Sequence, residues 1–183
     1  MASLAPELPS NAPIEVETTR DLFAAVYARL KAMAANQLSR TPRASTLQTT
    51  GLVHELYLRL SRQPDLQFAH RAQFFAYAAR AMRHLLADHA RDRKRQKAGG
   101  DWMRVTLTGD HEQFALESAE AALELEAVIA RLADVDARAA QVLELRYFAG
   151  LTIEEIADTL QAAPRTIDRD WQFARIFVKA ELG

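Results

Sequence analysis

The sequence predicts an all-α protein built from two small helical domains joined by a flexible linker. Long stretches of the 183-residue chain repeat apolar residues at intervals of three and four, as an amphipathic helix requires. Proline and glycine fall between these stretches, and the composition changes over residues 98–118. We therefore expect a disordered tail at residues 1–17, a first domain at 18–97, the linker at 98–118 and a second domain at 119–183.

The first domain is predicted to contain three helices. One begins near Thr18, and a second begins near Leu52, after a break around Pro42. The second helix has one broad apolar stripe, formed by Leu52, Val53, Leu56, Tyr57 and Leu60. Thr49 or Thr50 is expected to cap its N-terminus. The third helix runs from residue 68 to about residue 97 and is alanine-rich.

The linker and the second domain follow. The alternating run at residues 103–108 predicts at most one extended segment in the linker. In the second domain Asp136 is placed to cap a helix, and Thr152 with Glu155 forms a capping box. Pro164 fits the first position of the last helix.

Composition excludes several classes of site and of location. The chain has no cysteine, which rules out disulfides, thiolate metal sites and cysteine nucleophiles. It shows no secretory signal and no apolar run long enough for a membrane helix, so we expect a cytoplasmic protein without a membrane partner.

Charge is divided unevenly between the two halves. Residues 1–97 hold 15 Lys and Arg against 8 Asp and Glu, a net charge of +7. Residues 98–183 hold 8 against 16, a net charge of −8. The split indicates an anionic partner for the first half.

The segment at residues 151–175 has the layout of a helix-turn-helix, whose second helix enters the DNA major groove. Ile167 and Trp171 share the inner stripe of that helix. The outward residues near its start are Arg165, Thr166, Arg169 and Gln172. Arginine can grip guanine and glutamine can pair with adenine, although such residues are also common on any solvated helix.

The helix near the end of the first domain is strongly basic. Between residues 80 and 97 there are seven Lys and Arg against two Asp, a net charge of +5. DNA phosphates would supply the counter-charge. The upstream Phe74, Phe75 and Tyr77 could stack on unpaired bases, but Phe74 and Phe75 are better explained as core residues.

No catalytic or metal site emerges from the sequence. His84 and Asp88 have helical i, i+4 spacing, yet no compact third ligand accompanies them. There is also no glycine-rich phosphate loop and no nucleophile elbow. We expect neither an enzyme nor a cofactor.

Three motifs in order give the chain a family resemblance. They are "GLVHELYLRL", "FFAYAARAMRHLLADHARDRKR" and "LELRYFAGLTIEEIADTLQAAPRTIDRDWQFAR". Together they resemble a bacterial extracytoplasmic-function (ECF) sigma factor of the sigma-70 family, over roughly residues 18–180. The segments "TTGLVHE", "AMRHLLADHAR" and "RTIDRDW" suggest the branch associated with Ser/Thr protein kinases.

The resemblance implies partners and roles. Residues 18–97 would be sigma region 2 and residues 119–183 sigma region 4, with the clamp helices and flap of core RNA polymerase and promoter DNA as partners. Polymerase would be bound by Leu52, Glu55, Leu56 and Arg59. The −10 element would be contacted by Arg80, Arg83, His84, Arg91, Arg93, Lys94 and Arg95. The −35 element would be contacted by Arg165, Thr166, Arg169 and Gln172, and an anti-sigma factor is a further candidate partner.

One departure from the family suggests regulation. Relatives place an acidic tetrad before the polymerase-binding helix, whereas residues 48–51 read Gln-Thr-Thr-Gly. Phosphorylation of Thr50, or less favourably Thr49, by a Ser/Thr kinase would restore negative charge there. His84 also stands where many relatives have asparagine.

Two other functions are alternatives to a sigma factor. A free-standing helix-turn-helix regulator would bind duplex DNA without polymerase and would not need the basic helix. A nucleic-acid-processing enzyme would need an acidic metal cluster in the basic half, which the scattered acids do not form.

Overall fold

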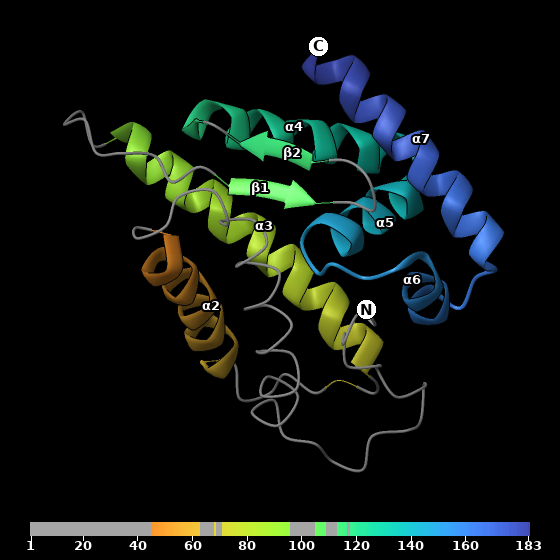
Figure 1. Ribbon diagram of the computed structural model, residues 1–183, viewed down its shortest axis with the longest axis horizontal. Helices are drawn as coiled ribbons and strands as arrows, with labels where there is room; N and C mark the ends of the chain where they lie inside the picture. Colours follow the sequence, from red (N-terminus) through yellow and green to blue (C-terminus); the bar gives the residue numbers. More distant parts are fainter. Residues whose placement is uncertain (1–44, 63–67, 69–70, 96–104, 109–112, 117) are drawn as a thin grey trace, which may run out of the picture.

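The computed structural model describes residues 45–62, 68, 71–95, 105–108, 113–116 and 118–183. Within these residues it contains six helices and one two-stranded sheet (Figure 1). The elements are α2 (Ser45–Ser61), α3 (Arg71–Arg95), β1 (Val105–Thr108), β2 (Gln113–Leu116), α4 (Ala119–Val135), α5 (Ala137–Tyr147), α6 (Ile153–Leu160) and α7 (Pro164–Leu182). The predicted helical fold is confirmed. The predicted tail and the helix expected near Thr18 lie outside the described residues.

Helix α2 begins earlier than the sequence suggested. Its first residue is Ser45, so Thr49 and Thr50 lie in its second turn and do not cap it. The predicted cap is therefore wrong. Gly51 lies within the helix, and glycine weakens a helix interior by only about 1 kcal/mol. The apolar contacts of Val53 and Leu56, which are buried, can offset that cost.

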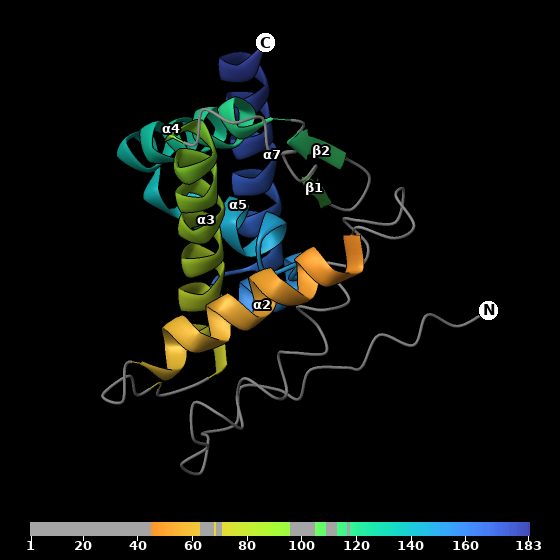
Figure 2. The ribbon, with the colours of Figure 1, turned by 90° about the vertical axis from the view of Figure 1, so that its left-hand side faces the viewer.

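Helix α3 lies between α2 and the C-terminal helices (Figures 1 and 2). It begins after the predicted start, since Phe68 is not helical and the helix runs from Arg71; the predicted end near residue 97 lies outside the described residues. Small alanines and larger apolar side chains alternate over its buried surface, which lets neighbouring helices approach closely. Phe74 and Phe75 are buried, as their interpretation as core residues required.

The linker contains a hairpin where one extended segment at most was expected. Strands β1 and β2 pair antiparallel, with Val105 opposite Leu116 and Thr108 opposite Gln113. The second strand was missed because Gln113–Leu116 has too short a pattern to predict a strand alone. It forms a strand through its hydrogen bonds to β1, and β2 also contacts α4.

The predicted starts of the C-terminal helices are largely confirmed. Asp136 caps α5 by accepting hydrogen bonds from the backbone N–H groups of Arg138 and Ala139, each at 3.0 Å. Pro164 occupies the first turn of α7, as predicted. At the start of α4, Ser118 accepts from the N–H of Ala121 at 3.1 Å.

The two halves of the chain share one apolar core in this structure. Helix α3 packs against α4 and α5, and buried side chains run continuously from α2 to α7. This packing could not be predicted from the sequence. The pattern of each helix shows which face is apolar and must be buried, but it does not show which other helix buries that face. The division of the chain into two domains joined by a flexible linker remains a prediction.

Candidate nucleic-acid interfaces

Helix α7 is anchored by its inner face. Ile167, Trp171, Ala174 and Val178 are buried, as predicted. The Tyr147 ring meets Trp171 edge-on at 5.2 Å between ring centroids, and burial raises the pKa of the Tyr147 phenol. These contacts hold the outer face of α7 in a defined orientation.

An ion pair with a buried carboxylate ties α7 to α5. Both carboxylate oxygens of Asp170 accept from the Arg138 guanidinium, at 2.5 and 3.3 Å. The Asp170 side chain is only 4% exposed, whereas that of Arg138 is about half exposed. The hydrogen bond and the charge of Asp170 raise the pKa of Arg138. This bidentate pair adds direction to the apolar anchor.

A short turn joins α6 to α7, in the order of elements that a helix-turn-helix requires. The hydroxyl of Thr152 accepts from the Glu155 backbone at 3.2 Å, and the Glu155 carboxylate accepts from the Thr152 N–H at 2.8 Å, which confirms the capping box. Gln161 ends α6 in the left-handed region, with φ of 51°. Ala163 gives no side-chain cap to α7, as its sequence implied.

The outer face at the start of α7 is open to solvent. Arg165, Arg169 and Gln172 are exposed, and Thr166 is half-buried. Arg175 donates to the Gln172 side-chain oxygen at 3.2 Å. The structure therefore brings the four predicted −35 residues together on an anchored helix.

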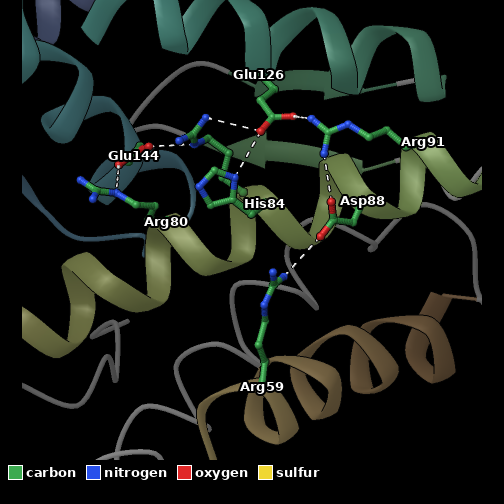
Figure 3. A network of polar contacts seen from close by, with 8 residues as sticks. Arg59, Arg80, His84, Asp88, Arg91, Glu126 and Glu144 are labelled. Atoms are coloured by element: carbon green, nitrogen blue, oxygen red, sulfur yellow. Dashed lines mark hydrogen bonds and ion pairs between the residues drawn. The ribbon is translucent and has the colours of Figure 1, made fainter. Parts of the chain in front are cut away.

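The basic residues of α3 lie in a different environment. Three of them meet carboxylates from the C-terminal half (Figure 3). Glu144 of α5 lies 2.7 Å from Arg83 and 3.8 Å from Arg80. The Glu144 side chain is 8% exposed and that of Arg83 is 13% exposed. The charges of this pair are less screened by water than those of a surface pair, although the Arg83 Nε–H group is not aligned for a hydrogen bond.

Glu126 of α4 makes the second set of contacts. It accepts from Arg91 at 2.7 Å, is hydrogen-bonded to His84 at 3.2 Å, and lies 3.8 Å from Arg83. The network continues through Asp88, which accepts from Arg91 at 2.9 Å (Figure 3). Lys94 and Arg95 are exposed at the end of α3, and the side chain of Arg93 lies outside the described part. Among the predicted −10 residues described here, Arg83 is thus shielded, whereas Arg80, His84 and Arg91 are paired with carboxylates but remain 62%, 42% and 46% exposed.

Sequence reasoning did not identify Glu126 and Glu144. A signal was present, since Glu144 interrupts the apolar run at residues 142–145 and is itself buried. The opposite charges of the two halves were a second signal. That asymmetry was interpreted as evidence for an external anion, but part of the counter-charge lies within the same chain.

The predicted polymerase-binding residues are only partly on the surface. Leu56 is fully buried, so it lies beneath this surface and supports it instead of forming it. Glu55 is hydrogen-bonded to His89 at 2.8 Å, and Arg59 donates to Asp88 at 3.4 Å. Both side chains are about half exposed. The side chain of Leu52 lies outside the described residues.

The described residues contain neither a group of metal ligands nor a membrane-spanning helix. Among the described residues, no three His, Cys, Asp or Glu side chains are grouped as metal ligands, and His84 faces Glu126. None of the described helices combines the length and the apolar character needed to span a membrane.

Comparison with known proteins assigns the family. The family described as ECF sigma factor matches residues 15–183, nearly the whole chain. No curated protein and no solved structure matches the chain.

Proposed function

The chain belongs to the ECF sigma factor family, and from this premise we propose how its helices divide the work of transcription initiation. Members of the family bind core RNA polymerase and promoter DNA, which explains why the chain carries two distinct basic helices. We assign α7 to the −35 element, α3 to the −10 element and α2 to the polymerase. The observation that carries the proposal is the exposed polar face of α7 on a buried, ion-paired anchor.

The −35 assignment has the strongest physical support. Arg165 and Arg169 are exposed within the first two turns of α7, the part of a recognition helix that reaches base edges. Thr166 and Gln172 complete this face. Residues 119–183 would then act as region 4.

The −10 assignment concerns strand-separated DNA. Arg80, Arg91, Lys94 and Arg95 provide positive charge along α3. Residues 18–97 would act as region 2 and residues 98–118 as the linker between the regions. The loop between Arg62 and Arg71, expected to hold a flipped base, lies largely outside the described residues.

Polymerase would be contacted at two places. Glu55 and Arg59 on α2 would face the clamp helices. Phe173 and Ile176, apolar residues that are 41% and 68% exposed, would meet the flap from the C-terminal half of α7. An anti-sigma factor would compete for one of these surfaces. A protein with these partners works in the cytoplasm.

We retain the proposal that a Ser/Thr kinase activates the protein at Thr50, or alternatively Thr49, on revised grounds. Both residues lie in the second turn of α2, so a phosphate there would not meet the unpaired N–H groups of the first turn. Its contribution would be charge, about −1.5 to −2 at neutral pH. This charge would replace the acidic contact that relatives make with polymerase.

The assignment is tested by run-off transcription with purified core polymerase, on the promoter upstream of the protein's own operon. We expect transcripts only when both proteins are present. A gel shift without polymerase supplies the contrary outcome, since tight duplex binding by the isolated chain would indicate a free-standing regulator.

The phosphorylation proposal needs its own comparison. Thr50→Ala should abolish kinase-dependent transcription, because no phosphate can then supply the missing charge, whereas Thr46→Ala in the same helix should not. Transcript yield with and without the inducing signal is the measurement. Equal induction of Thr50→Ala and wild type would contradict the proposal for Thr50 and leave Thr49 to be examined by the same substitution.

A further inference from the structure

On one side of α3 the side chains of Arg80, Arg83, His84 and Arg91 all meet acidic residues of the same chain, and these residues shield Arg83 from solvent. Glu126 and Glu144 reach it from α4 and α5 (Figure 3). Each carboxylate meets more than one of these four side chains. The contact is therefore a two-carboxylate clamp across the boundary between the two halves of the chain.

The clamp and DNA would compete for the same donors. The Arg83 guanidinium is 13% exposed and lies between Glu144 at 2.7 Å and Glu126 at 3.8 Å. A phosphate that approached Arg83 would have to displace these carboxylates, since they already occupy the anion position. Carboxylate and phosphate each present two anionic oxygens that a guanidinium can bind together, so one can stand in for the other.

An apolar contact joins the same helices as the clamp. Helix α3 packs on α4 and α5, and the buried core runs across this contact. Exposing the basic side of α3 would then require the halves to move apart as well as the ion pairs to break. Charge alone does not hold the arrangement closed.

We propose that the C-terminal half inhibits the DNA-binding face of α3, with Glu126 and Glu144 as substitutes for DNA phosphates. The inference rests on the proposed role of α3 in binding strand-separated DNA. In the isolated protein the clamp keeps this face closed, and opening accompanies DNA binding. The acidic half of the chain is thus a competitor of promoter DNA.

The first test compares two variants that lose the same amount of negative charge. Glu126→Gln with Glu144→Gln removes the clamp, and Glu120→Gln with Glu124→Gln removes two exposed carboxylates from α4. Fluorescence anisotropy would follow binding of each full-length chain to a labelled single-stranded oligonucleotide without polymerase. Thermal unfolding of both variants would check that they fold.

The clamp variant should bind the oligonucleotide more tightly and with a steeper salt dependence. Releasing Arg80, Arg83 and Arg91 adds about 0.7 per phosphate contact to the salt slope, or about 2 in total. Between about 50 and 200 mM salt its affinity should fall roughly 20-fold more than that of wild type. Equal affinity and equal slope in the clamp and control variants would overturn the proposal.

A second measurement does not depend on the clamp variant folding. The chain lacks cysteine, so dyes can be attached at His54→Cys on α2 and Lys179→Cys on α7, both exposed. Energy transfer between them should fall when saturating oligonucleotide is added, because the halves separate. Unchanged transfer would also overturn the proposal.

Run-off transcription separates this inference from the proposed function. If the wild-type chain starts transcription with core polymerase but the clamp and control variants bind the oligonucleotide alike, only the clamp is wrong. If no transcription occurs with core polymerase, the proposed function itself has failed.

Discussion

Two helices of this protein, α7 and α3, carry arginine side chains in opposite environments. Arg169 on α7 is 76% exposed, and its ion pair with Asp170 is long, at 3.9 Å. Arg83 on α3 is 13% exposed and lies 2.7 Å from Glu144. The surface around Arg169 is therefore open to a ligand, whereas Arg83 is already paired with a carboxylate of the same chain.

The difference lies in what each helix packs against. The inner face of α7 packs against the core, and its outer face is exposed to solvent. Helix α3 is covered on one side by α2 and on the other by α4 and α5. A basic helix identifies a potential anion site, but only its neighbours determine whether that site is accessible.

The largest expected effect is on stability and compares one arginine from each helix. Arg83→Ala leaves Glu126 and Glu144 without their shared partner, and breaking such a buried pair costs about 3 kcal/mol of unfolding free energy. Arg169→Ala should change it by no more than about 0.5 kcal/mol, since the side chain is exposed. Urea unfolding measures both. Equal losses of unfolding free energy in the two variants would show that Arg83 and Arg169 do not lie in different environments.

The second effect concerns DNA recognition by the open surface. Arg165→Ala should weaken binding of the polymerase holoenzyme to duplex −35 DNA by about 1–3 kcal/mol, because a base contact is lost. Lys179→Ala, exposed near the other end of α7, is the control and should bind as wild type does. Titration of a labelled −35 duplex gives both affinities. A loss shared by both variants would point to general charge and not to base recognition.

The smallest effect sharpens the description of α7 itself. Ala163→Ser supplies the side-chain acceptor that the first turn lacks, and a serine cap stabilises a helix by about 1 kcal/mol relative to alanine. The melting temperature should therefore rise. Thr152→Ala, which removes an existing cap from α6, should lower it and serves as the opposite control. An unchanged melting temperature for Ala163→Ser would mean that the start of α7 is stabilised by other contacts.

The sequence by itself determined much of the C-terminal half. Capping residues such as Asp136 and Thr152 act on N–H groups within three residues, so local sequence is enough to place the helix starts. The buried stripe of Ile167 and Trp171 follows from helical periodicity in the same way. Its complement, the exposed face with Arg165 and Arg169, was predicted for that reason.

Only the tertiary structure decided the rest, because it depends on contacts between distant residues. Strand β2 exists through pairing with β1, and α2 extends back to Ser45 through a glycine that alone would favour a break. Glu126 and Glu144 lie 35 or more residues along the chain from the α3 side chains they meet most closely, Arg91 and Arg83. The charge of each half could be read from the sequence. That the two halves neutralise each other could not, because ion pairing depends on distance in space.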